Sequence, residues 1–254
     1  MTPVRYSIVI PAYNETQRIG RALEQIVAWV RQEGLTAEIL VVDDGSRDNT
    51  PDLVREHASR HPIIRLVSNP GNRGKGYSVR HGMREATGDL LLFTDTDLSA
   101  PIAEAAKLFR EIEAGAGVAI GSRWLQRQSQ TTRQPLYRQL GGRIFNLWLR
   151  LVLDLPFQDT QCGFKAFHRP AADALFAAQL VEGWGFDAEL LYLARRFGIR
   201  AVEVPVVWAD DARSKINPYV DGLKIVTDVL RVRCNALTGR YPPPAAPAGS
   251  PGLS

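Results

Sequence analysis

The sequence DLLLFTDTD, from Asp89 to Asp97, decides the fold. Its apolar centre, residues 90–94, is short and uninterrupted, which is typical of a parallel strand buried on both faces. Asp95 and Asp97 follow directly, and open α/β sheets bind ligands beyond the carboxyl ends of their strands. Paired carboxylates at that edge suit Mg²⁺ or Mn²⁺ held against a diphosphate. The same spacing also occurs in turns and helix caps, so the pair alone leaves both interpretations open.

Strands and helices alternate on both sides of this stretch. Strand-like runs are separated by segments with helical spacing, and Pro51 directly after Thr50 marks one helix start. This order predicts an α/β fold with a Rossmann-like, mostly parallel central sheet and helices on both faces. The expected strands are residues 7–10, 38–42, 63–67, 90–94 and 117–121, and the expected helices include residues 19–31, 77–86 and 102–114.

The composition fits a globular chain with a full hydrophobic core. Of the 254 residues, 45% are hydrophobic and 23% charged, which allows a core without disulfide or metal staples. Cys162 and Cys234 are too few for a disulfide framework or a zinc site, so a reducing compartment is expected. The first residues lack the layout of a signal peptide, and no apolar stretch approaches the roughly 18 residues of a membrane span. We therefore expect a cytoplasmic protein that is soluble or lies on a membrane surface.

Basic residues cluster in two places within a mildly basic chain of net charge +4. Such clusters indicate an anionic partner, either phosphate groups or an acidic lipid surface, although solvated arginines on helix faces explain part of them. Residues 143–153 are apolar nearly all round, which fits either a core helix or a helix at a membrane interface. The proline-rich residues 242–254 are expected to form a disordered tail. The clusters comprise Arg123, Arg127, Arg133, Arg138, Arg143 and Arg150, and Lys224, Arg231, Arg233 and Arg240.

Three further strand-end segments carry candidate ligand-binding residues. Residues 11–15 (PAYNE) follow the first strand, and residues 43–46 (DDGS) follow the second. A carboxylate such as Asp43 can accept hydrogen bonds from a base or ribose, whereas a plain turn is the other interpretation. The glycine-rich residues 69–76 allow close backbone approach to phosphate, and Lys75 adds positive charge at a helix start. Their spacing differs from that of a P-loop.

Together these segments resemble the family 2 glycosyltransferases of GT-A fold. The resemblance covers residues from about 5 to 235 and is greatest for the polyprenyl-phosphate branch, in particular the dolichyl-phosphate β-glucosyltransferases. It rests on residues 7–15, 41–46, 72–76 and 95–97, and it extends through residues 121–123 (GSR) and 159–165 (DTQCGFK).

That resemblance implies one GT-A domain over residues 1–235, with a nucleotide-binding half at 1–100 and an acceptor-binding half at 101–235. The implied reaction moves a hexose, first of all glucose from UDP-glucose, to a polyprenyl or dolichyl phosphate with inversion at the anomeric carbon. GDP-mannose and UDP-GlcNAc remain alternative donors. The implied partners are a nucleotide-diphosphate sugar, a polyprenyl phosphate lipid and the cytoplasmic face of a membrane, with Mg²⁺ or Mn²⁺ as cofactor and no nucleic acid. The oligomeric state is left open.

The resemblance also assigns site residues in the nucleotide-binding half. Asp97 would bind the metal. Mannosyltransferase relatives often carry a glutamine two residues further on, where this chain has Ser99, and a hydroxyl is a poorer ligand. This departure counts against GDP-mannose as donor. The donor nucleotide would be held by Pro11, Ala12, Tyr13, Glu15, Asp43, Lys75, Asp95 and Thr96.

In the acceptor half, Arg123 and Arg133 are the candidates to grip the lipid phosphate, because guanidinium forks match phosphate oxygens. Ser214 and Lys215 lie in a late loop that would close over the phosphates. Asp159 would act near the reacting centre by positioning or electrostatics, and Asp187 would either meet sugar hydroxyls or cap a helix. A lipid phosphate is already anionic near neutral pH, so a general base is not strictly required.

Three other interpretations compete with this one. A soluble family 2 transferase acting on a sugar or peptide hydroxyl would need a general base and no lipid-facing helix. A nucleotide-sugar-binding module without catalysis would have no need to keep both Asp95 and Asp97. A nucleotidyltransferase of similar topology would carry a glycine- and arginine-rich loop after the first strand, where this chain has residues 11–15.

Overall fold

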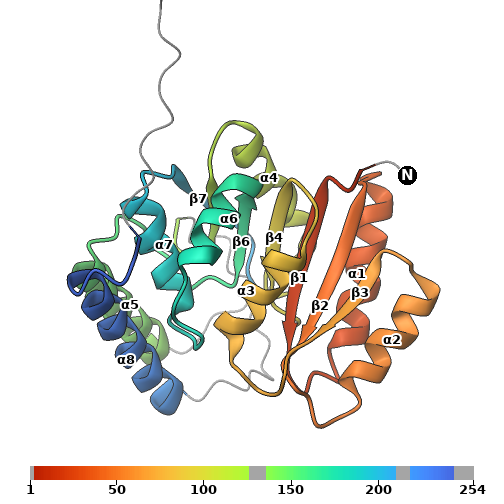
Figure 1. Cartoon of the computed structure of the whole chain (residues 1–254), viewed down its shortest axis with the longest axis horizontal. Coiled ribbons are helices and arrows are strands. Elements are labelled where there is room, and N and C mark those ends of the chain that lie inside the picture. The colour runs from red at the N-terminus through yellow and green to blue at the C-terminus, as the bar shows by residue number, and fades with distance from the viewer. Residues whose placement is uncertain (1–2, 126–135, 210–217, 243–254) are drawn as a thin grey trace, which may run out of the picture.

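The structure is a computed structural model that describes residues 3–125, 136–209 and 218–242. Figure 1 shows the described chain as a twisted sheet with helices packed against both of its faces. Three of the predicted acceptor residues, Arg133, Ser214 and Lys215, lie outside the described residues. So does nearly all of the predicted tail, since the description ends at Pro242.

The described strands form a single mixed sheet. They are β1 (Tyr6–Ala12), β2 (Ala37–Asp43), β3 (Ile64–Ser68), β4 (Leu90–Thr94), β5 (Val118–Ser122), β6 (Phe164–His168) and β7 (Ala201–Pro205), in the spatial order β3-β2-β1-β4-β6-β5-β7. All neighbouring pairs are parallel except those of β6, which runs antiparallel to both β4 and β5. The predicted mostly parallel α/β sheet is confirmed, and β6 is the reversed strand within it.

Alternating side chains of the strands form two cores, one on each face of the sheet. Ile8 belongs to the core covered by α1 (Ile19–Gln32), α2 (Thr50–Arg60) and α4 (Ala105–Glu113). Val9, the next residue, belongs to the opposite core, as expected for a strand buried on both faces. That second core is covered by α3 (Lys75–Glu85), α5 (Leu136–Leu153), α6 (Arg169–Ala178), α7 (Phe186–Arg196) and α8 (Pro218–Leu237).

Helix α3 packs unusually close to the sheet, which fixes the position of its first residue, Lys75. A Cβ at Gly82 would lie only 2.4 Å from Val9 Cγ1 and 2.7 Å from Val42 Cγ2. Any larger residue would push the helix away from β1 and β2, because such contacts are well inside van der Waals distance. Close packing at Gly82 therefore holds the N-terminus of α3 against the carboxyl ends of these strands.

Helices α5 and α8 lie side by side at one end of the molecule (Figure 1). The predicted helix at 143–153 is confirmed as the C-terminal part of α5. Leu149 and Leu153 are buried in the core, whereas Leu147 and Leu151 are exposed. The segment therefore has a core-facing side and an exposed apolar side. Within the described ranges, α5 and α8 included, no helix has the length and hydropathy needed to cross a membrane.

Candidate active site

The carboxyl ends of β1, β2 and β4 and the start of α3 surround a cavity of ≈ 330 Å³. This is the edge at which the sequence predicted a ligand site, since these strands are parallel and end together. The cavity is lined by Pro11, Ala12, Tyr13, Glu15, Arg18, Asp44, Asn72, Gly74, Lys75, Ser78, Asp95, Thr96, Asp97 and Trp184. Seven of the eight predicted nucleotide-binding residues and Asp97 are thus brought together.

Asp43 is the predicted residue that the cavity lining does not include. Its buried carboxylate accepts hydrogen bonds from the backbone N–H of Ser46 at 3.3 Å and so shapes the turn after β2. The adjacent Asp44 lines the cavity instead. Its two oxygens accept hydrogen bonds from the backbone N–H groups of Arg73 (2.9 Å) and Gly74 (2.8 Å). Asp44 therefore holds the glycine-rich loop in place at the cavity wall.

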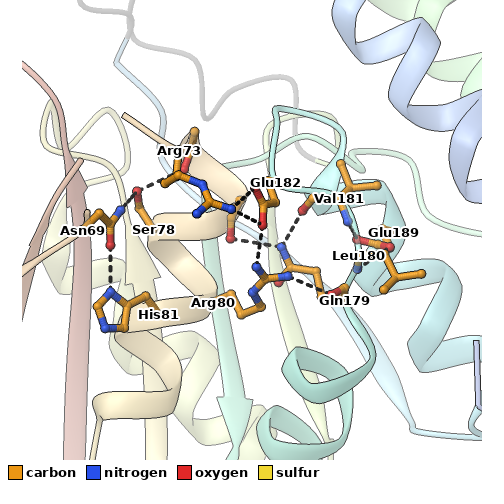
Figure 2. A network of polar contacts seen from close by, with 12 residues as sticks. Asn69, Arg73, Ser78, Arg80, His81, Gln179, Leu180, Val181, Glu182 and Glu189 are labelled. Atoms are coloured by element: carbon orange, nitrogen blue, oxygen red, sulfur yellow. Dashed lines mark hydrogen bonds and ion pairs between the residues drawn. The ribbon is translucent and has the colours of Figure 1, made fainter. Parts of the chain in front are cut away.

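Asn69 extends this support behind the loop, as Figure 2 shows. Its side-chain amide donates to Asp44 Oδ1 at 2.8 Å and to Ser78 Oγ at 2.9 Å, and its oxygen lies 2.7 Å from His81 Nδ1. Gly74, the residue before α3, has φ = 106° and no room for a side chain, because a Cβ would lie 2.6 Å from Glu182 O. The loop is thus fixed by side chains on one side and by backbone contact on the other.

Lys75 and Asp95 form a salt bridge at the floor of the cavity, with 2.6 Å between Lys75 Nζ and Asp95 Oδ1. Burial opposes the charge of Lys75, but the carboxylates of Asp95, Asp187 and Asp97 outweigh that effect and raise its pKa. Lys75 is therefore a fixed positive charge at neutral pH. It lies at a helix N-terminus, where anions are favoured.

The negative charge of Asp97 is less well balanced by its surroundings than that of Asp95. Burial raises its pKa, and the negative charge of Asp95 raises it further. Its Oδ1 accepts a hydrogen bond from the backbone N–H of Ser99 at 3.0 Å. Among the described residues, no basic side chain forms a salt bridge with Asp97. The positive charge of Arg18 on the cavity wall lowers this pKa but does not outweigh the effects that raise it. The negative charge of Asp97 is therefore only partly balanced, which suits the binding of a cation.

The donor set fits a divalent metal that takes few protein ligands. The described ranges contain no group of three or more His, Cys, Asp or Glu side chains able to hold a metal by themselves. Mg²⁺ and Mn²⁺ are commonly held by one or two carboxylates together with phosphate oxygens and water. Asp97 is the residue that would hold such an ion, because Asp95 already binds Lys75.

The part of the cavity wall formed by the residues after β1 contains a second ion pair. Arg18 Nε and Nη2 each lie 2.6 Å from the carboxylate of Glu15, three residues earlier. Asn14 between β1 and this pair has φ = 54°, the left-handed conformation that asparagine tolerates better than most residues. The side chain of Tyr13 is 39% exposed and so is accessible to a planar ligand group.

The reversed strand β6 brings the segment 159–165 to the same edge. Thr94 pairs with Phe164 across β4 and β6, so Gly163 lies next to Asp95. A Cβ at Gly163 would lie 2.1 Å from Asp95 Oδ2, so a larger residue there would displace the carboxylate that binds Lys75. Lys165, fully buried on β6, pairs with Asp187 of α7. Asp187 is therefore not the cap of α7, which begins after Gly185 without a side-chain cap, and its contact with sugar hydroxyls stays a prediction.

Arg123 and Asp159 form a bidentate pair beyond the carboxyl end of β5. Arg123 Nε donates to Asp159 Oδ2 at 2.7 Å, Nη2 donates to Oδ1 at 2.8 Å, and the Arg123 backbone N–H donates to Oδ2 at 3.0 Å. Burial disfavours the Asp159 carboxylate, but the Arg123 guanidinium outweighs this and lowers its pKa. With three donors on its oxygens, Asp159 is poorly suited to accept a proton from a substrate.

Several cavity residues were not assigned from the sequence. Arg18 comes three residues after Glu15, a spacing that favours an ion pair near a helix start. The sequence therefore contained the information needed to predict this pair. Asp44 carried the same turn signal as Asp43. Trp184 reaches the cavity from the loop between α6 and α7.

A scan against known protein families matches residues 7–176 to the model described as glycosyl transferase family 2. The chain belongs to this family. It is 36% identical over 239 residues to the dolichyl-phosphate β-glucosyltransferase ALG5C of Trichomonas vaginalis, covering 89% of this chain and 70% of that protein. It is 32% identical over 250 residues to the human dolichyl-phosphate β-glucosyltransferase, covering 92% of this chain and 76% of the relative. The family predicted from the strand-end motifs is therefore confirmed.

Solved structures of similar fold include the glucosyl-3-phosphoglycerate synthase of Mycobacterium tuberculosis. Its complex with Mn²⁺ and UDP-glucose aligns with a TM-score of 0.64 and 22% identity over 91% of this chain and 79% of that chain. Its complex with Mn²⁺, UDP and glucosyl-3-phosphoglycerate gives a TM-score of 0.65, also at 22% identity, over 91% of this chain and 80% of the other. At this identity the likeness shows the fold, and the GT-A fold of the present chain is confirmed.

Proposed function

We propose that this family 2 glycosyltransferase moves glucose from UDP-glucose to a polyprenyl phosphate of the dolichyl type, with a divalent cation and inversion at the anomeric carbon. The observation that carries the proposal is the cavity in which Lys75, Asp95 and Asp97 meet residues 11–15. The names of the relatives, dolichyl-phosphate β-glucosyltransferases, support the donor sugar and the acceptor.

In the proposed reaction, an oxygen of the lipid phosphate forms a bond to the anomeric carbon while the bond from that carbon to the UDP oxygen breaks. UDP leaves with the electron pair. Lys75 would stabilise the charge that develops on the leaving diphosphate, since its ammonium is fixed and charged. Asp97 would hold Mg²⁺ or Mn²⁺, which when bound supplies further positive charge at the diphosphate. The cavity wall around Tyr13 and Glu15 would receive the nucleoside.

The acceptor phosphate needs no general base because it is already anionic near neutral pH. We assign Arg123 to this phosphate, since a guanidinium fork suits phosphate oxygens. The bidentate hydrogen bonds from Arg123 to Asp159 support a positioning role for Asp159. Arg133, Ser214 and Lys215 stay predicted acceptor residues outside the described ranges.

We further propose that α5 and α8 form the surface that meets the membrane, on its cytoplasmic face. Leu151 on α5 is 73% exposed and Leu237 on α8 is 76% exposed, and three other leucines of these helices are also largely exposed. Lys224, Arg231 and Arg233 of α8 are exposed as well. Apolar side chains with adjacent cations suit an interface containing anionic lipids.

The decisive experiment incubates the full chain with Mn²⁺ or Mg²⁺, a short polyprenyl phosphate and one of three donors: UDP-glucose, UDP-GlcNAc or GDP-mannose. A lipid-linked glucose from UDP-glucose is expected, with much slower transfer from the other two. The β configuration of the product, read by NMR, checks inversion. Absence of lipid-linked sugar with every donor would overturn the proposal. Sedimentation with anionic vesicles, compared for wild type and Leu151→Ser, tests the membrane surface separately.

A soluble transferase acting on a hydroxyl is the second candidate, and it predicts a general base near the anomeric carbon. The described part of the cavity lining offers Glu15, Asp44, Asp95 and Asp97 as carboxylates. Glu15 binds Arg18, Asp44 binds the glycine-rich loop and Asp95 binds Lys75. These contacts favour the phosphate acceptor, which requires no base.

A further inference from the structure

The ammonium of Lys75 is held by more than its salt bridge. Besides Asp95 Oδ1 at 2.6 Å, it lies 5.3 Å from the ring centroid of Phe93 and 5.0 Å from that of Trp184. Cations within about 6 Å of an aromatic ring centroid are attracted by the ring quadrupole, most strongly by tryptophan and when water is excluded. Two rings and a carboxylate thus confine the end of a side chain that has four rotatable bonds.

The two rings differ in origin and accessibility. Phe93 belongs to β4 and is fully buried in the core of the sheet, so its position is set by the fold. Trp184 lies in the loop between α6 and α7 and lines the cavity itself. Trp184 is therefore the partner of Lys75 that approaches from the acceptor half of the chain.

The loop that carries Trp184 is anchored to α3 on one side (Figure 2). The Tyr77 backbone N–H donates to Glu182 O at 3.1 Å, next to Lys75 on the first turn. The Glu182 carboxylate accepts hydrogen bonds from Arg73 Nη2 at 3.0 Å and from Arg80 Nη2 at 2.9 Å. These contacts of Glu182 lie close in sequence to Trp184 on one side and to Lys75 on the other. They therefore hold the loop of Trp184 at a fixed distance from Lys75.

Two buried carboxylates anchor the same loop on its other side. Glu189 of α7 accepts hydrogen bonds from the backbone N–H groups of Leu180 and Val181, both at 2.9 Å. Asp228 of α8 accepts one from the Gly185 N–H at 3.0 Å. A Cβ at Gly185 would lie 2.3 Å from Asp228 Cβ, so the loop rests directly on α8. The loop that carries Trp184 is thus held by contacts with α3, α7 and α8.

We propose that Trp184 is a positioning residue of the donor site, which fixes the ammonium of Lys75 toward the diphosphate of a bound nucleotide sugar. The role rests on the proposed function, since it presumes that a UDP-sugar occupies the cavity. Without the indole, the ammonium keeps its salt bridge to Asp95 but gains freedom to turn away from the ligand. On this proposal Trp184 acts through Lys75. Replacing Trp184 must therefore have no effect on the affinity for UDP-glucose once Lys75 has been replaced.

A double-mutant cycle tests this dependence. The affinity for UDP-glucose is measured by calorimetry with Mn²⁺ and no acceptor for wild type, Trp184→Leu, Lys75→Met and the double variant. Trp184→Leu is expected to weaken binding about 5- to 30-fold in the wild-type background and less than about twofold in the Lys75→Met background. Trp184→Phe, which keeps an aromatic face, is expected to recover most of the affinity, and it forms a second cycle with Lys75→Met if the leucine variant does not fold.

Trp29→Leu is the matched control. Trp29 is buried on α1 near Tyr6 and Phe109, by the start of β1 rather than its carboxyl end. Its loss is expected to lower the unfolding temperature without changing the affinity for UDP-glucose. Equal weakening by Trp184→Leu in both backgrounds, or no weakening at all, would overturn the positioning role while leaving the proposed function intact. A wild-type chain that binds no UDP-glucose would instead overturn the proposed function, and the role of Trp184 with it.

Discussion

The loop after β4 contains the partly buried Asp97, the segment at Arg123 contains the buried Asp159, and the electrostatic surroundings of the two aspartates are opposite. Asp159 is matched by a bidentate guanidinium, which lowers its pKa. Asp97 has a second carboxylate beside it, which together with burial raises its pKa. A protein tolerates a matched buried pair as structure, whereas an unmatched buried carboxylate is retained where a ligand supplies the missing charge. Arg123 and Asp159 balance each other's charge, whereas the charge of Asp97 is expected to be balanced by the cation that the site is proposed to bind.

Replacing Asp97 by asparagine is expected to have the largest effect on activity. The change keeps the shape of the side chain but removes the charge that would hold the cation, so transfer should fall about 10²- to 10³-fold. The measurement is the initial rate of lipid-linked sugar formation at saturating Mn²⁺. Asp52→Asn is the control, because Asp52 pairs with Arg55 on the exposed surface of α2. Equal rates for both variants would remove Asp97 from the metal site.

Replacing Asp159 by asparagine is expected to affect folding stability most. The change leaves the Arg123 guanidinium without its anionic partner, and breaking a buried ion pair typically costs about 3–5 kcal/mol. The lower end of that range is expected, because the Arg123 side chain is 24% exposed and water can reach it. The free energy of unfolding in urea measures the loss.

Asp154→Asn provides the comparison, since Asp154 and Arg195 form an ion pair on the surface with the aspartate 78% exposed. Exposed pairs contribute less than about 1 kcal/mol. If Asp159→Asn were no less stable than Asp154→Asn, the Arg123 pair would have to be regarded as a surface pair. The contrast between Asp159 and Asp97 would then disappear.

The third and smallest expected effect is a difference in pH dependence, because Asp97 and Asp159 protonate in different pH ranges. The raised pKa of Asp97 means that its carboxylate protonates at a higher pH than that of an ordinary aspartate, whose pKa is 3.8. Its contribution to folding stability is present below that value and is lost as the pH rises through its folded pKa. The lowered pKa of Asp159 has the opposite sign, since its contribution is present above 3.8 and is lost as the pH falls through its folded pKa.

On acidification, cation-dependent ligand binding should therefore weaken before the fold is lost. UDP-glucose is a suitable ligand because its diphosphate is esterified at both ends and does not titrate in this range. Its Mn²⁺-dependent affinity, measured by calorimetry between pH 7 and pH 4, is expected to fall about tenfold per pH unit once Asp97 protonates. Circular dichroism over the same range checks that the chain stays folded. Binding and folding that are lost together would contradict the separation.

Much of the fold follows from the sequence because the alternation of strands and helices is regular. Residues 90–94 are bounded as predicted, and the other predicted strands differ from the observed ones by a few residues at their ends. Strands β6 and β7 were not predicted, and the direction of β6 could not have been, because an apolar run has the same pattern in a parallel and an antiparallel strand. That direction decides that residues 159–163 reach the cavity edge, where Gly163 contacts Asp95.

The candidate site was predictable to the level of its loops. Asp43 and Asp44 carry the same turn signal, but successive side chains at a strand end point to opposite sides, and only Asp44 lines the cavity. Trp184 reaches the cavity through a loop held by α3, α7 and α8, which no local pattern reports. Local chemistry identifies which loops meet a ligand, and tertiary packing decides which side chains do.

The place of β6 in the sheet also bears on how the chain is synthesised. All five residues of β4 are buried, and β6 covers the edge of β4 that faces away from β1. During translation β4 leaves the ribosome well before β6, so for that interval an apolar strand has one unpaired edge. Such edges readily pair with other chains and aggregate. A fragment of residues 1–100 would keep this edge unpaired permanently, so we expect aggregation from the fragment and none from the full chain.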